Sequence, residues 1–161
     1  MAFADPSTPN AADFLLFVRE QGVLVAYLPD NSDYLTWALG YAQNICIPAP
    51  ASLSQTYVGA TLSASPYVLA VYNLGVHRLL MIAQDQDNQT FFTDQRKVFS
   101  LMSFTPGPIQ SSADQSTSES MVVPDWVKML PLQSLSLLKT PWGRFYLEYA
   151  QMFGPELFGV S

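Results

Sequence analysis

The segment that determines how the chain folds at its C-terminal end is Leu137-Leu-Lys-Thr-Pro-Trp-Gly-Arg-Phe-Tyr-Leu-Glu-Tyr-Ala-Gln-Met-Phe-Gly154. Thr140 is a favourable helix N-cap, Pro141 suits the first helical position, and Gly154 provides a stop. Between these signals, aromatic residues recur every three or four positions and share one helical face: Trp142, Phe145, Tyr146, Tyr149 and Phe153. The segment predicts a short helix that packs this face either on the chain's own core or on another subunit.

Four further helices are predicted upstream: one capped by Asn10 that runs to about Gln21, one that follows the start signal at 29–33 and stops before Pro48, and two at about 66–84 and 90–102. Asn10 followed by Asp13 resembles a capping box, and Ser65-Pro66 opens the longest helix. The apolar positions of 66–84 wrap nearly all round, which predicts burial on several sides. The helix at 90–102 is expected to turn five apolar residues inward: Phe91, Phe92, Val98, Phe99 and Met102.

The segment 105–119 breaks the helical pattern, since it is rich in Ser and Thr and has one large apolar residue, Ile109. Such a segment cannot form a core by itself. The flanking pieces 103–104 and 121–123 are candidates for the two legs of a long hairpin. We therefore predict a mainly α fold, a small bundle of about five helices with a long polar loop or β-hairpin and extended terminal arms. The domain division is a flexible arm at 1–9 and a single helical domain at 10–161, with the loop inserted at 104–123.

Charged residues make up only 12% of the chain and hydrophobic residues 49%, whereas a typical soluble domain carries about 25% charged residues. Two interpretations remain open: part of the exterior is covered by partners, or Ser, Thr, Gln and Asn cover it. The net charge is −6, and no basic cluster exceeds Arg96-Lys97. This charge pattern argues against binding of nucleic acid by a basic face.

The chain has one cysteine, Cys46, so it cannot form an internal disulfide, which fits a reducing compartment. Its first ten residues lack the basic start and apolar core of a secretion signal. The run 66–83 superficially resembles a membrane span, but Asn73, His77 and Arg78 interrupt it. A buried helix is the better interpretation, and we expect no membrane partner.

Candidate catalytic and metal-binding residues are scarce. His77 is the only histidine and lies among apolar neighbours, so it is expected to be structural. One His and one Cys cannot supply the usual zinc ligands, and the loop starting at Asp85 lacks the glycine and glutamate of a calcium loop. Gly143 is expected to make room for a neighbouring helix, and Arg144 to pair with Glu148. We therefore expect that the protein is not an enzyme and that it binds no cofactor and no metal.

Three pieces in this order and spacing resemble a known family. They are Tyr67-Val-Leu-Ala-Val-Tyr-Asn-Leu-Gly75, Ser111-Ser-Ala-Asp-Gln-Ser-Thr-Ser118 and Leu138-Lys-Thr-Pro-Trp-Gly-Arg-Phe-Tyr-Leu-Glu-Tyr-Ala-Gln151. Together they resemble the head-to-tail connector (adaptor) proteins of tailed bacteriophages, over residues 12 to 155. These small structural proteins extend the portal vertex of the capsid.

The resemblance implies a helical protomer that assembles as a homo-oligomeric ring, typically of about twelve copies with heterologous contacts. Such a ring docks on the portal protein, joins the capsid vertex to the tail proteins and surrounds double-stranded DNA without binding it specifically. It implies a location in the head–tail neck of the virion after assembly in the host cytoplasm, with no cofactor and no catalytic residues. The candidate partner-contact residues are Trp142, Arg144, Phe145, Tyr146, Tyr149, Ile109 and Asp114.

Two alternatives stay open. One is a tail-completion or stopper protein at the same vertex. The other belongs to a different class, a small helical domain that binds an apolar ligand in a pocket lined by aromatic residues.

Overall fold

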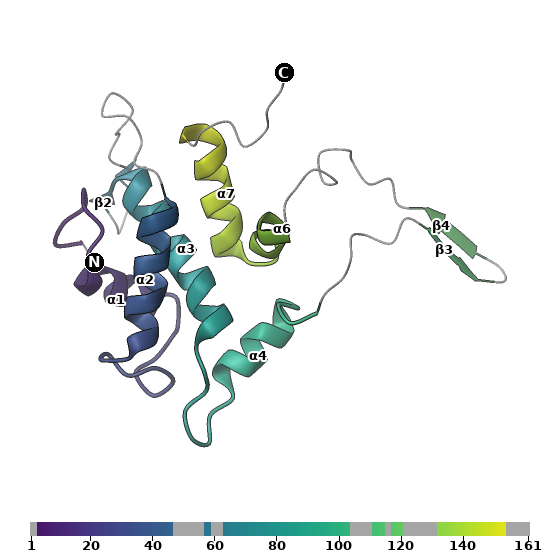
Figure 1. Cartoon of the computed structure of the whole chain (residues 1–161), viewed down its shortest axis with the longest axis horizontal. Coiled ribbons are helices and arrows are strands. Elements are labelled where there is room, and N and C mark those ends of the chain that lie inside the picture. Colours follow the sequence, from purple (N-terminus) through teal and green to yellow (C-terminus); the bar gives the residue numbers. More distant parts are fainter. Residues whose placement is uncertain are drawn as a thin grey trace.

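The computed structural model describes residues 3–46, 57–58, 63–103, 111–114, 117–120 and 132–153. The fold is mainly helical, as the sequence predicts: the described residues form six helices and two short hairpins (Figure 1). The helices are α1 (Ala11–Glu20), α2 (Asp33–Ile45), α3 (Pro66–Ile82), α4 (Phe91–Val98), α6 (Leu132–Leu138) and α7 (Pro141–Phe153). The strands are β1 (Tyr57–Val58) with β2 (Ser63–Ala64), and β3 (Ser111–Asp114) with β4 (Thr117–Ser120), both pairs antiparallel.

Side-chain caps set the start of three elements. The Asn10 side chain accepts a hydrogen bond from the Asp13 N–H at α1, and the Ser65 hydroxyl accepts one from the Val68 N–H at α3. The Asp85 carboxylate accepts from the Phe92 N–H and reaches forward to cap α4. The turn that starts at Asp85, which lacks the features of a calcium loop, is therefore a capping turn for α4.

Helix α3 is the centre of the body (Figure 1). It packs against α2 on one side and α7 on the other, and it also contacts α1 and α4. Eleven of its residues are buried, from Val68 to Leu80. The predicted burial on several sides is confirmed, and the run that superficially resembled a membrane span is this core helix.

The described part of the N-terminal arm, residues 3–9, differs from the loose segment that the sequence suggests. Phe3 is buried, with its ring centroid 5.3 Å from that of Tyr72 on α3 in an edge-to-face arrangement. The backbone N–H groups of Ala4 and Asp5 donate to the Asp13 carboxylate at 2.8 and 2.9 Å. One aromatic side chain and one buried carboxylate thus anchor the arm, although its prolines and small residues suggested little to bury.

The predicted helix at 90–102 is too long and partly misassigned. Helix α4 ends at Val98, and Ser100 adopts a φ of 51°, a left-handed conformation that turns the chain. Val98 and Met102 were expected to face inward, but their exposed fractions are 73% and 77%. Phe92 is buried, as expected.

Within 104–123, the strands that the structure describes form an antiparallel hairpin. Ser111 pairs with Ser120, and Asp114 with Thr117. The proposed legs at 104 and 121–123 lie outside the described residues. Helix α6, which is not among the helices predicted from the sequence, packs beside α7 (Figure 1).

Candidate functional site: the two faces of α7 and the groove between α1 and α2

The start of α7 is fixed to α3 by a buried polar contact. The Thr140 hydroxyl oxygen accepts a hydrogen bond from the Gly143 N–H at 3.0 Å, and it lies 2.7 Å from His77 Nδ1. Burial, with a smaller contribution from the Arg78 charge, lowers the pKa of His77 to about 4, so the imidazole is neutral at pH 7. His77 is a satisfied structural histidine, as the sequence suggested.

Gly143 lies where the backbones of α6 and α7 almost touch. A Cβ added at this position would collide with the Leu137 carbonyl oxygen. The expectation that Gly143 makes room for a neighbouring helix is confirmed.

The aromatic residues of α7 divide between two faces. Tyr149 is buried in the core, and Trp142 and Tyr146 pack against it. The indole N–H of Trp142 donates to Gln21 Oε1 at 3.0 Å, and burial raises the pKa of Tyr146 to about 12. Three of the predicted contact residues therefore pack on the chain's own bundle.

A flank of α7 next to the packed aromatic residues is exposed and partly apolar. Phe145 and Met152 have exposed fractions of 40% and 62%, and they lie seven positions apart, on the same side of the helix. Arg144 is exposed beside them. It was expected to pair with Glu148, and that prediction is wrong, since no ion pair joins the two. We call Arg144, Phe145 and Met152 the outer face of α7.

Two predicted contact residues remain, Asp114 and Ile109. Asp114 is the last residue of β3, where its backbone pairs with Thr117. Ile109 lies outside the described residues.

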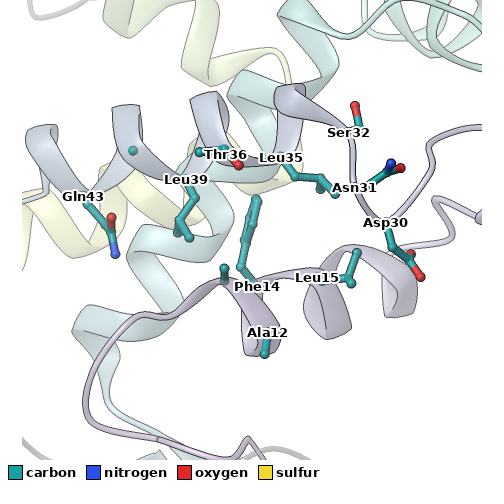
Figure 2. Close-up of a pocket in the computed structure, with 12 residues that line it drawn as sticks. Ala12, Phe14, Leu15, Asp30, Asn31, Ser32, Leu35, Thr36, Leu39 and Gln43 are labelled. Carbon is teal, nitrogen blue, oxygen red and sulfur yellow. The ribbon is translucent and has the colours of Figure 1, made fainter.

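A groove of about 410 Å³ lies between α1 and α2, and sequence reasoning did not identify it (Figure 2). Phe14 extends from α1 toward Leu35 and Leu39 on α2 and forms the apolar floor. Polar residues surround it toward the ends: Asp30, Asn31, Ser32, Thr36 and Gln43. The only sequence signal was the apolar spacing of the two helices, which does not distinguish a closed contact from an open one.

Gly40 and two alanines make the groove wide. Gly40 lies in the middle of α2, and a Cβ added there would meet no atom within 4 Å. Ala11 and Ala12 form the α1 wall and are exposed. At one end of the groove, the Asp30 carboxylate pairs with the Arg19 guanidinium, and 59% of the Asp30 side chain is exposed.

Other candidate chemistry is sparse in the part of the chain that the structure describes. The Cys46 thiol is buried, and burial raises its pKa to about 12, so it is protonated at pH 7. Among the described residues, no three His, Cys, Asp or Glu side chains are placed to hold a metal ion. None of the described helices combines the length and apolar character needed to cross a membrane.

Comparison of the chain with protein-family models, with curated proteins and with solved structures gave no match.

Proposed function

We propose that this protein is a virion structural protein, an adaptor subunit that forms a ring on the portal and joins the capsid vertex to the tail around the DNA channel. The observation that carries the proposal is the β3–β4 hairpin, which projects away from the helical body (Figure 1). The substantial contacts of each strand are with the other strand. An isolated two-stranded hairpin is marginally stable in water. A hairpin held away from its own body is therefore well suited to reach and pair with a neighbouring protein.

Exposed apolar side chains are a second observation that supports assembly into a ring. Large hydrophobic side chains are exposed on several elements of the described body: Leu24, Val25, Trp37, Ile45, Val98, Met102, Phe145 and Met152. Subunits of a ring bury such residues against neighbours. The low content of charged residues is consistent with this role.

The resemblance of three sequence segments to head-to-tail connectors supports the specific assignment. In this proposal the ring contains about twelve copies, contacts portal and tail proteins, and lies in the head–tail neck after assembly in the host cytoplasm. The net charge of −6 is compatible with DNA passing the ring without adhering to it. The proposal assigns no enzymatic activity and no cofactor.

Particle mass and shape test this role directly. Mass photometry and negative-stain microscopy of the purified chain, alone and with the portal protein encoded in the same phage genome, should show rings or portal-bound rings. A chain that remains monomeric and does not bind the portal overturns the proposal.

The hairpin requires a separate variant. Replacing 111–120 with a short Gly/Ser linker should preserve the helical circular dichroism signal and abolish assembly. The matched control replaces Asn88, which lies in the exposed turn before α4, with Gly. Because Asn88 has a φ of 60°, glycine is tolerated there, and assembly should be unchanged.

A further inference from the structure

We propose that Lys139 positions the β3–β4 hairpin for assembly, because its ammonium group fixes the turn at which the chain leaves the helical body. The inference rests on the ring-forming role proposed above, in which the hairpin reaches a neighbouring protein (Figure 1). It adds to that role the residue of the body that determines where the hairpin is carried.

The hairpin is attached to the body only through the two ends of its segment. The chain leaves the helical body after Ser103, which follows α4, and returns at Leu132, the first residue of α6. Between these two residues the structure describes β3 and β4, and the substantial contacts of each strand are with the other strand. The place of the hairpin therefore depends on how the chain departs and returns.

The departure point is a well-defined turn at the end of α4. The Ser100 N–H donates to the Lys97 carbonyl oxygen at 3.0 Å. The Leu101 N–H donates to the Arg96 carbonyl oxygen at 2.9 Å. Together with the positive φ of Ser100, this pattern is the Schellman ending of a helix. The turn has one backbone conformation, so a contact that holds it also sets the direction of the chain that follows.

Lys139 provides such a contact from the corner between α6 and α7. Its Nζ donates to the carbonyl oxygens of Ser100 and Ser103, each at 2.7 Å. Hydrogen bonds from a charged donor are shorter and stronger than those between neutral groups. Within the described ranges Lys139 forms no ion pair. Its charge is therefore directed at the turn and not at a carboxylate.

The corner that carries Lys139 is itself fixed to the core. The next residue, Thr140, is fully buried, caps α7 and contacts His77 on α3. Phe99, directly before the turn, packs edge-to-face on Trp142, with 5.7 Å between the ring centroids. Lys139 and Trp142 thus hold the turn from the same corner, and the departure point has a fixed place relative to α3.

Removal of the ammonium group tests the effect on assembly. Lys139→Met keeps an unbranched apolar side chain and loses both hydrogen bonds. Because Ser100 and Ser103 are exposed, water can replace the lost donor, and thermal unfolding should change little. Self-association, measured by mass photometry over a concentration series with and without portal, should weaken by about tenfold or more.

Two further variants separate positioning from loss of charge. Lys139→Arg retains a cation with donors for two carbonyl oxygens, so it should restore assembly. The matched control is Lys97→Met, which removes an exposed lysine from α4 and should assemble like wild type. If Lys139→Met unfolds at lower temperature and Lys139→Arg does not recover assembly, Lys139 supports only the fold.

A distance measurement on the isolated chain tests the positioning without assembly. Spin labels are attached at Glu20→Cys, an exposed position of α1, and at Thr117→Cys, the first residue of β4. The native Cys46 is buried, so it should remain unlabelled. Pulsed electron paramagnetic resonance should give the same distance distribution with Lys139 and with Lys139→Arg. In Lys139→Met the distribution should shift or broaden.

The outcomes separate this inference from the function on which it rests. A Lys139→Met distribution that matches wild type overturns the positioning role, whatever the state of assembly. A displaced hairpin in rings that assemble like wild type overturns its importance for the ring. A wild-type chain that remains monomeric with and without portal overturns the proposed function, and the distance measurement still decides whether Lys139 positions the hairpin.

Discussion

His77 Nδ1 lies 2.7 Å from the Thr140 hydroxyl, inside the contact between α3 and α7. Both residues are buried, with exposed fractions of 4% and 0%. Because the same hydroxyl oxygen accepts from the Gly143 N–H, its own proton is available to donate to the neutral imidazole. One hydroxyl group therefore both caps α7 and joins it to α3, so the docking of the aromatic helix depends on the protonation of one histidine.

We predict that the free energy of unfolding falls as pH drops from about 6.5 to about 4. The folded-state pKa of His77 is lowered to about 4 from 6.5, so the unfolded chain binds the proton first, and stability is lost across that window. The expected loss is about 3 kcal/mol. Urea unfolding at pH 7, 5.5 and 4.5 measures it.

The control for this pH dependence is His77→Asn. Its amide oxygen can accept from Thr140, and it does not titrate. Asp13 and Asp85 have lowered pKa values, so their contributions are lost at more acidic pH in both proteins. If the variant loses as much stability as wild type between pH 6.5 and 4.5, the dependence does not arise from His77.

Thr140→Val should destabilise the protein by about 1–3 kcal/mol, because it removes the cap of α7 and leaves His77 without its partner. Valine preserves the volume, so the effect isolates the hydroxyl. Thr140→Ser retains the hydroxyl and should recover most of the loss in thermal unfolding. If Thr140→Ser destabilises the protein and Thr140→Val does not, the methyl group matters and the hydrogen bond does not.

Two glycine substitutions should have opposite signs. Gly143→Ala should destabilise by about 1–3 kcal/mol, because its Cβ collides with the Leu137 backbone. Gly40→Ala should stabilise the isolated chain by about 0.5–1 kcal/mol, because its Cβ meets nothing. Thermal unfolding of the two variants under dissociating conditions checks this. Destabilisation by Gly40→Ala would mean that the α1–α2 groove is closed in solution.

The parts of this fold that were predictable from sequence are those that depend on local chemistry. The caps at Asn10, Ser65 and Thr140 depend on neighbouring residues, and each begins a helix near where it was predicted. The all-round apolar pattern of 66–84 correctly indicated a central helix. Periodicity and capping therefore sufficed for the helical body.

The missed parts depend on contacts between distant segments. Val98 and Met102 were assigned to the core because an unbroken helix would place them there, and the turn at Ser100 removes them from it. The burial of Phe3 depends on Tyr72, which lies far along the chain. The division of the α7 aromatic residues depends on how α7 rests on α3, and the α1–α2 groove depends on the separation of two helices. No local pattern encodes these quantities.

We predict that Asp13→Asn loosens the N-terminal arm. Burial alone raises the pKa of Asp13, but hydrogen bonds from the backbone N–H groups of Asp5 and Ala4 and from Asn10 outweigh it, and the net pKa is lowered. An amide is a weaker acceptor than a carboxylate, so the loss should be about 1–3 kcal/mol. Hydrogen exchange at the amides of Ala4 and Asp5 should accelerate. Unchanged exchange there would show that other contacts hold the arm, such as the buried Phe3 ring and the hydrogen bond from the Ser65 N–H to the Pro6 carbonyl oxygen.

Substitutions on the two faces of α7 should affect different properties. Tyr149→Ala should lower stability by about 3–5 kcal/mol because it removes a buried ring, and the half-buried Trp142 and Tyr146 should show smaller losses. Phe145→Ser with Met152→Ser should lower the free energy of unfolding of the isolated chain by less than Tyr149→Ala does, because Met152 is 62% exposed and Phe145 is 40% exposed.

The outer-face double variant should nevertheless fail to assemble, because it removes the apolar side chains offered to a neighbour. Unfolding in urea and mass photometry on the same preparations separate the two effects. If the double variant unfolds early, the outer face supports the fold, and its exposure does not mark a partner surface. If it folds and assembles like wild type, α7 contributes only to its own bundle, and the ring must close through the hairpin or another exposed apolar surface.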